Sequence, residues 1–130
     1  TMTDINVTIS GKIDRIDNED GLLNIIDYKT SRKKEKSERN LQMALYTEAI
    51  LNDSVSDIKG NPGKAILHFL RHGDDPVSSH SFSKEELENS REKIRNVAEG
   101  IRSGSFETKK GKYNCQYCDY KYFLCPAWEE

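Results

Sequence analysis

Two aspartates and a lysine lie at positions that a tight hairpin would bring together. Asp14 precedes the turn-forming pair Asp20-Gly21, and Asp27 and Lys29 follow it. A turn at this pair places Asp14 opposite Asp27, and alternation along the strand puts Lys29 on the same face. Like charges opposite each other destabilise a strand pair unless a cation or a shared proton compensates them. A hard divalent metal, Mg²⁺ or Mn²⁺, is the natural compensation.

A surface charge network explains the same pattern equally well. Lys12 and Lys29 could neutralise the two aspartates on an exposed sheet face, where charged residues are usual. The spacing alone does not separate this interpretation from a metal site. By the same alternation Arg15 and Asp17 lie on the opposite face, and we expect them to form a structural ion pair.

The elements that would position these side chains follow from the hydrophobic pattern. Two segments rich in β-branched residues, Asn6–Asp17 and Leu22–Lys29, predict an antiparallel hairpin within residues 5–29. Residues 30–39 are charged and lack an apolar period, so they predict an exposed connection. Residues 40–51 predict an amphipathic helix because apolar side chains recur at helical spacing. These side chains are Leu41, Ala44, Leu45 and Ala49.

Two further strands are expected in residues 64–82. Asn61-Pro62-Gly63 predicts a turn, after which the short apolar run Lys64–Arg71 is typical of a buried strand. A shorter strand near His80–Phe82 would pair with it.

A second helix is expected over residues 83–103. Ser83 and Glu86 have the spacing of a capping box, in which each side chain bonds the backbone amide of the other residue. The helix should end near Gly104. The resulting order of elements predicts an α/β or α+β domain whose helices flank a mixed, mostly antiparallel sheet.

Length and composition narrow the class of protein. A chain of 130 residues is long enough for one domain. Its formal charge of −2 means that a basic surface for nucleic acid would have to be local. The absence of a signal-peptide pattern and of an apolar run of ~18 residues predicts a cytoplasmic protein that does not cross a membrane.

Three blocks of the chain resemble known nucleases. They are Gly-Lys-Ile-Asp-Arg-Ile-Asp at 11–17, Ile-Ile-Asp-Tyr-Lys-Thr at 25–30, and Gln42-x-x-x-Tyr46. In this order and spacing they resemble PD-(D/E)XK nuclease domains of the RecB and AddB type and the related CRISPR-associated nucleases. The resemblance covers nearly the whole chain. It implies a restriction-endonuclease-like core that cleaves DNA in repair or recombination.

The resemblance also assigns roles to individual residues. Asp14 and Asp27 would ligate Mg²⁺ or Mn²⁺, and the main-chain carbonyl of Tyr28 would complete the metal shell. Lys29 would position or activate the attacking water and stabilise the developing charge. Gln42 and Tyr46, which share one face of the predicted helix, would contact DNA or orient the lysine. Without the resemblance they are the polar edge of a helix.

The three cysteines, Cys115, Cys118 and Cys125, fall within the last sixteen residues. An odd, clustered set suits a metal or cluster site better than a disulfide framework. The tail over residues 113–126 resembles the C-terminal block of iron–sulfur members of this nuclease group, whose fourth cysteine lies upstream of the catalytic strands. We expect a remnant of a four-ligand site here and an iron–sulfur cluster in the full-length protein. The histidines are not expected to supply the fourth ligand.

The resemblance further implies an upstream helix bearing a histidine or glutamate. Since this chain begins almost at the first catalytic strand, we expect a fragment, with a helicase domain in the same polypeptide or complex. Two alternatives stay open. One is a catalytically incomplete DNA-binding module of the same fold, and the other is a zinc or iron–sulfur interaction domain built on the cysteines.

Overall fold

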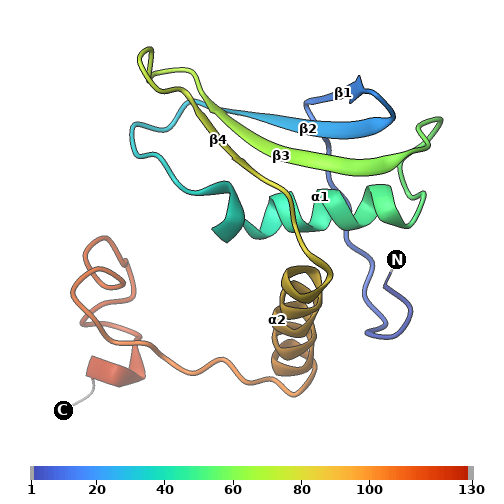
Figure 1. Cartoon of the computed structure of the whole chain (residues 1–130). Helices are drawn as coiled ribbons and strands as arrows, with labels where there is room; N and C mark the ends of the chain where they lie inside the picture. The colour runs from blue at the N-terminus through green and yellow to red at the C-terminus, as the bar shows by residue number, and fades with distance from the viewer. Residues whose placement is uncertain (1, 129–130) are drawn as a thin grey trace. The chain divides into compact units, whose positions relative to one another are not determined.

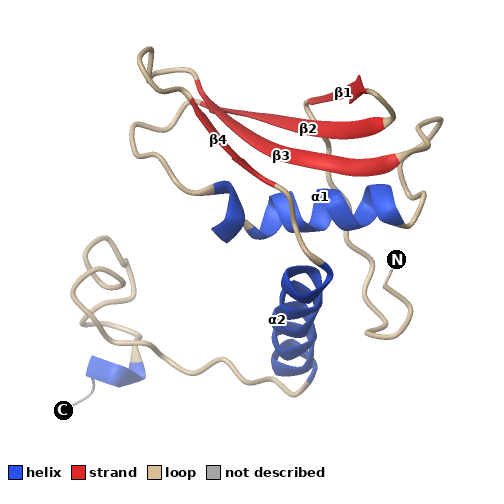
Figure 2. Cartoon of the chain, in the orientation of Figure 1, coloured by secondary structure: helices blue, strands red, loops and turns tan. Residues whose placement is uncertain are grey.

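Four strands form one mixed sheet in the computed structural model, which describes residues 2–128 (Figures 1 and 2). In sheet order the strands are β1 (Arg15–Glu19), β2 (Leu22–Lys29), β3 (Asn61–Phe69) and β4 (Val77–His80). The β1–β2 and β3–β4 pairs are antiparallel, whereas β2 and β3 are parallel. The helices are α1 (Leu41–Leu51) and α2 (Lys84–Arg102), with short 3₁₀ turns η1 (Ser37–Arg39) and η2 (Pro126–Trp128). The predicted α+β fold with a mixed, mostly antiparallel sheet is confirmed.

The chain divides into two compact units, one ending at Arg95 and the other starting at Asn96. The sheet, α1 and the first part of α2 belong to the first unit. The cysteine tail belongs to the second unit. Within residues 2–128, neither helix has the length and apolar character needed to cross a membrane.

The hairpin between β1 and β2 turns through two residues, Asp20 and Gly21. Their φ angles are 51° and 84°, the left-handed values that a tight hairpin turn of this kind requires. Asn18 supports the turn because its Oδ1 accepts a hydrogen bond of 3.0 Å from the Gly21 amide. Ile16 lies opposite Ile25, which confirms the predicted register.

The first strand is shorter than predicted. β1 begins at Arg15, so the expectation of a strand from Asn6 was wrong. The preceding segment is held by other contacts: Met2 and Val7 form an isolated bridge, and the Lys12 carbonyl accepts a hydrogen bond from a tyrosine of α1. β-branched residues favour extended backbone, but a strand forms only where a neighbouring backbone completes the ladder.

β3 starts earlier than predicted, at Asn61, so Pro62 and Gly63 lie within a strand and not in a turn. Pro62 is tolerated because it is the second residue of the strand, beside a register irregularity in β2. Gly63 leaves room for the Asn24 side chain, since an added Cβ would lie 2.3 Å from Asn24 Oδ1 and would force that side chain to move. β4 is also shifted, to Val77–His80 from the predicted residues 80–82.

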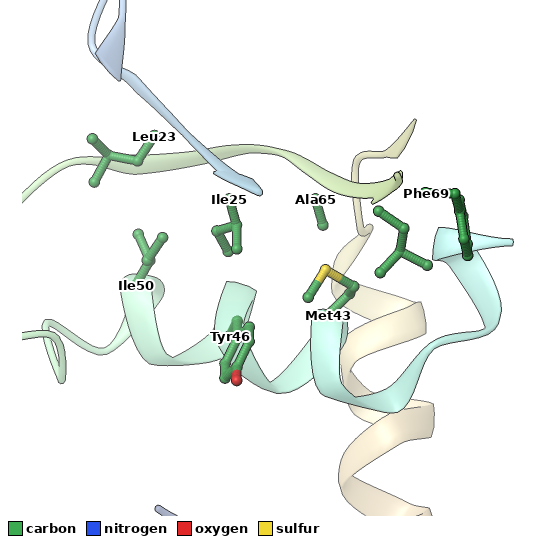
Figure 3. Packing of buried hydrophobic residues seen from close by; sticks show 8 residues of the cluster. Leu23, Ile25, Met43, Tyr46, Ile50, Ala65 and Phe69 are labelled. Atoms are coloured by element: carbon green, nitrogen blue, oxygen red, sulfur yellow. The ribbon is translucent and has the colours of Figure 1, made fainter. Parts of the chain in front are cut away.

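The core lies between α1 and the two central strands (Figure 3). From α1, it takes Met43, Tyr46 and Ile50, which pack against residues of β2 and β3. Of the predicted apolar stripe on α1 only Ala44 is fully buried, whereas Leu45 and Ala49 are half-buried and Leu41 is 41% exposed. The helix is apolar on two faces, so periodicity alone could not select the one that faces the sheet. The core cluster is Leu23, Ile25, Met43, Tyr46, Ile50, Ala65, Leu67 and Phe69.

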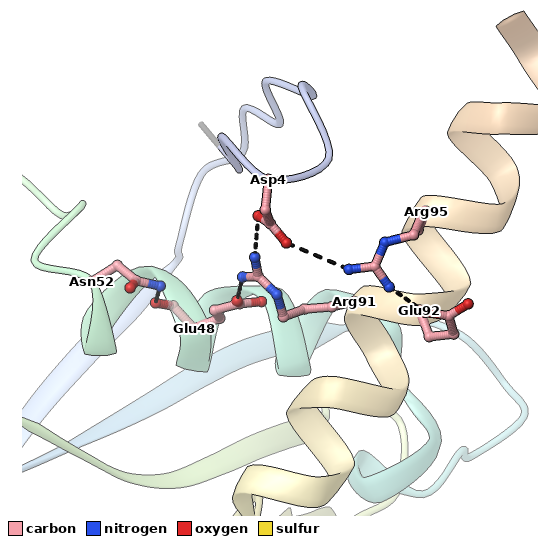
Figure 4. Close-up of polar contacts among 6 residues, drawn as sticks. All are labelled: Asp4, Glu48, Asn52, Arg91, Glu92 and Arg95. Atoms are coloured by element: carbon pink, nitrogen blue, oxygen red, sulfur yellow. Dashed lines mark hydrogen bonds and ion pairs between the residues drawn. The ribbon is translucent and has the colours of Figure 1, made fainter.

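An ionic network joins α1, α2 and the N-terminal segment (Figure 4). The guanidinium of Arg91 in α2 pairs with Glu48 of α1 and with Asp4. Arg95, one turn further, lies 3.4 Å from Asp4 Oδ2. The hydrogen bond from Arg91 lowers the pKa of Asp4. Since the Glu48 side chain is only 9% exposed, Arg91 neutralises a largely buried carboxylate.

The predicted capping box begins α2. The Ser83 amide donates to Glu86 Oε2 at 2.7 Å, and the Glu86 amide donates to Ser83 Oγ at 3.2 Å. The hydrogen bond from the Ser83 amide lowers the pKa of the Glu86 carboxyl, and the hydrogen bond with His80 lowers it further. Gly104, with φ of 68°, follows the end of the helix as expected.

Replacing Ser83 with alanine is expected to lower the free energy of unfolding by about 1 kcal/mol, because the Glu86 amide loses its acceptor. Urea denaturation followed by circular dichroism measures this change. Ser90→Ala is the matched control, since Ser90 lies inside α2 and bonds only the Glu86 carbonyl among the described contacts. Equal effects of the two substitutions would contradict a capping role.

Candidate active site

Asp27 and Lys29 lie at the carboxyl end of the central strand β2. Asp27 is 5% exposed, and its Oδ2 lies 2.7 Å from Lys29 Nζ. Among the described residues, the Lys29 ammonium is the only polar partner of this buried Oδ2. A buried carboxylate oxygen is normally saturated with donors. Asp27 therefore retains acceptor capacity for a further cation.

Asp14 lies one residue before β1, outside the strand ladder. Its Oδ2 accepts a hydrogen bond of 3.0 Å from the Tyr28 amide. The expectation that Asp14 lies within the strand pair was wrong, because β1 begins only at Arg15. The Asp14 side chain instead accepts a hydrogen bond from an amide of β2 beyond the part that pairs with β1. This contact fixes Asp14 to the residue that directly follows Asp27.

A chain of hydrogen bonds runs from Lys29 across α1 to the segment before β1. Lys29 Nζ donates to Gln42 Oε1 at 3.0 Å, and Gln42 Nε2 donates to the Tyr46 hydroxyl at 3.0 Å. That hydroxyl donates in turn to the Lys12 carbonyl at 2.6 Å. Gln42 and Tyr46 thus hold both the lysine ammonium and the backbone that leads to Asp14.

Gly11 contributes to this arrangement although residue types alone did not single it out. A Cβ at this position would lie 3.1 Å from Cε1 of Tyr46. A larger residue would therefore press on the tyrosine ring that bonds the neighbouring Lys12 carbonyl. The only signal in the sequence was the place of Gly11 at the start of the first nuclease-like block.

Arg15 and Asp17 form the predicted ion pair, with 2.7 Å between Nε and Oδ1 and 2.8 Å between Nη2 and Oδ2. Arg15 Nη1 also donates to the Tyr28 hydroxyl at 3.3 Å. The hydrogen bond with Asp17 raises the pKa of Arg15 above its already high ordinary value. The charges of Arg15 and Asp17 are therefore paired with each other, and neither Asp14 nor Asp27 takes part in these contacts.

A groove of about 1190 Å³ adjoins the site between α1 and the segment that precedes β1. Asp14, Gln42 and Tyr46 are among its lining residues, and so is the second apolar stripe of α1. The stripe consists of Leu41, Leu45 and Ala49. Three of the four apolar side chains of the predicted stripe thus line a groove next to the candidate site, whereas Ala44 is buried.

The chain matches the model of the PD-(D/E)XK nuclease superfamily over residues 2–126. It belongs to this superfamily. No match was found among curated proteins or among solved structures. The match spans the sheet, both helices and the tail, and the α+β fold is consistent with a restriction-endonuclease-like core. Members of the PD-(D/E)XK nuclease superfamily are in general hydrolytic nucleases.

PD-(D/E)XK nucleases typically use Mg²⁺ or Mn²⁺, and the donors at this site fit such an ion. Within residues 2–128, no three side chains of His, Cys, Asp or Glu are grouped as a metal site. Two carboxylates suffice for Mg²⁺, which usually keeps several waters and takes substrate phosphate as a further ligand. Asp27 Oδ2, which is buried and contacted only by the Lys29 ammonium among the described residues, has acceptor capacity left for the ion.

The cysteines are not arranged for a cluster in the described part of the chain. All three are free thiols, and the Gly111 amide lies 3.4 Å from Cys115 Sγ. The histidines have partners within the first unit. The contacts are His68 with the ring of Tyr28, His72 with the Arg32 carbonyl, and His80 with Glu86.

Proposed function

We propose that this domain is a Mg²⁺- or Mn²⁺-dependent deoxyribonuclease whose active site consists of Asp14, Asp27 and Lys29. The observation that carries the proposal is the buried Asp27 carboxylate, whose Oδ2 lies 2.7 Å from the Lys29 ammonium and has no other polar partner among the described residues. A purely structural buried ion pair would be expected to have further hydrogen-bond donors on the same carboxylate oxygen.

Asp14, Asp27 and the carbonyl of Tyr28 would hold the metal ion. The ion would supply positive charge at the scissile phosphate and make a water nucleophilic near neutral pH. The hydrogen bond from the Tyr28 amide keeps the Asp14 carboxylate beside this position.

Lys29 would act on the phosphate or the attacking water through its ammonium group. Asp27 and Gln42 both contact that group, at 2.7 and 3.0 Å. A restrained cation costs little reorganisation when negative charge develops on the phosphate oxygens. Gln42 and Tyr46 are positioning residues in this proposal, and DNA contact by Gln42 is compatible with its place in the groove.

The finer assignment is to the RecB- and AddB-like branch, in DNA repair or recombination, with a helicase domain as partner. The three sequence blocks that contain Asp14, Asp27 and Gln42 support it. The cysteines of the tail would serve an iron–sulfur cluster only together with a fourth donor.

A DNA-binding module without cleavage is the second candidate. It is favoured by one observation: no third acidic, histidine or cysteine side chain joins the site within residues 2–128. Such a module would bind DNA without metal binding that depends on Asp14 and Asp27.

Metal binding and cleavage test the proposal together. Calorimetric titration with Mn²⁺ is expected to show binding that Asp27→Asn abolishes, because asparagine keeps the shape and removes the charge. Cleavage of a labelled DNA duplex with a single-stranded overhang should require Mg²⁺ or Mn²⁺ and disappear in EDTA.

Asp17→Asn is the matched control, because it removes a carboxylate from the same hairpin that pairs with Arg15 and not with Lys29. It should leave Mn²⁺ binding and cleavage unchanged. No cleavage, together with no Mn²⁺ binding that depends on Asp27, would reject the nuclease and favour the module.

A further inference from the structure

The segment that follows Lys29 concentrates positive charge in a chain whose formal charge is −2. It connects β2 to η1 and spans residues 30–39 with η1 included. Its basic residues are Arg32, Lys33, Lys34, Lys36 and Arg39, and its acidic residues are Glu35 and Glu38. The local excess of positive charge therefore begins next to the lysine of the candidate site.

This segment is held against the β3–β4 turn, residues 70–76. Lys34 Nζ donates to the Asp75 carboxylate at 2.6 Å, and the Leu70 amide donates to the Lys29 carbonyl at 2.9 Å. A third contact of 2.9 Å joins the His72 ring to the Arg32 carbonyl. Both segments lie at the same end of the sheet in Figure 1. The basic residues are thus placed on an anchored surface, next to the carboxyl end of β2.

Several of these cations are not neutralised by the protein. Among residues 2–128, the side chains of Arg32, Lys33, Arg39 and Arg71 are exposed and form no ion pair. Lys34, by contrast, is paired with Asp75. Exposed cations without a protein counter-charge attract a polyanion, which releases its own counterions when it binds.

We propose that residues 30–39 and 70–76 form a basic ridge that binds the phosphodiester backbone of DNA and leads it to Asp27 and Lys29. The ridge-forming side chains are Arg32, Lys33, Arg39 and Arg71. The choice of DNA as the occupant rests on the proposed function. The contact needs neither metal nor cleavage, because it depends only on the charge and placement of the ridge. Contacts to phosphate position a nucleic acid without reading its sequence.

The test measures DNA binding in EDTA by the full chain and by Arg32→Ala/Lys33→Ala. The probe is a fluorescein-labelled DNA duplex of about 30 base pairs with a single-stranded overhang, and anisotropy is followed across a range of KCl concentrations. Loss of two phosphate contacts should reduce the slope of log affinity against log salt by about 1.4 to 1.8. It should weaken affinity about 25- to 60-fold at 0.1 M salt.

Lys59→Ala/Lys64→Ala is the matched control. Both lysines are exposed, form no ion pair within residues 2–128, and lie toward the start of β3, away from the ridge. This control should keep the original slope and affinity within about twofold. An equal loss in both double variants, an unchanged slope in the ridge variant, or no salt-dependent binding by the unaltered chain would overturn the ridge.

The results that would reject the proposed ridge differ from the results that would reject the proposed nuclease activity. Cleavage by the unaltered chain together with an unchanged slope in the ridge variant rejects the ridge alone. Binding that depends on Arg32 and Lys33, with no cleavage under Mg²⁺ or Mn²⁺, retains the ridge and rejects the nuclease.

Discussion

Substitution of Lys29 by methionine is expected to lower the rate of DNA cleavage about 10²- to 10³-fold, because the cation that stabilises developing phosphate charge is lost. Methionine retains an unbranched side chain that can pack beside Asp27. Single-turnover rates at saturating Mn²⁺ measure the chemical step. Affinity for Mn²⁺ should not fall, since the buried Asp27 carboxylate then lacks its only ion-pair partner among the described residues.

The combination of lost cleavage with retained Mn²⁺ affinity distinguishes catalysis from structural support. Lys59→Met is the control, because Lys59 is exposed and lies before β3, outside the candidate site. Its cleavage rate should stay within about twofold of the original, as expected for a remote surface charge. A Lys29 variant that cleaves at the original rate would contradict the assigned role.

Substitution of Arg91 by alanine is expected to lower the free energy of unfolding by roughly 2–3 kcal/mol. Arg91 neutralises Glu48, whose side chain is 9% exposed. The substitution leaves that carboxylate without a cation, and its Oε2 already lacks a hydrogen bond. Urea denaturation at neutral pH, followed by circular dichroism, measures the change.

Arg95→Ala is the control from the next turn of the same helix. Its partners Asp4 and Glu92 are about half exposed, and exposed ion pairs contribute less than about 1 kcal/mol. Adding Glu48→Gln to the Arg91 variant should recover part of the lost stability, because the uncompensated charge is removed. Equal losses in the Arg91 and Arg95 variants would contradict this account.

Local chemistry in the sequence determined the hairpin turn, its register and the start of α2. Asp20 and Gly21 adopt left-handed φ values more readily than most residue pairs, and the two-residue turn then sets every opposed pair of β1 and β2. Ser83 and Glu86 satisfy each other's amides without help from the rest of the fold. Features of this kind need only neighbouring residues, so they could be predicted before the fold was known.

The residues of the candidate site could also be named in advance, from their types, the turn between them and the nuclease-like blocks. The contacts that these residues make could not be predicted from the sequence. The bond from the Tyr28 amide to Asp14 exists because β1 begins at Arg15, and the restraint of Lys29 by Gln42 exists because α1 packs beneath β2. Sequence spacing placed Asp14 on a strand, whereas the structure places it just outside one.

Tertiary packing alone decided which face of α1 is buried and where β3 begins. Leu41 and Met43 are both apolar, and only the position of the sheet selects Met43 for the core. Pro62 and Gly63 have strong turn propensity, yet pairing with β2 draws them into a strand. The physical reason is common to both cases: propensity and periodicity describe what a segment tolerates, while burial and ladder hydrogen bonds depend on which neighbours the rest of the chain supplies.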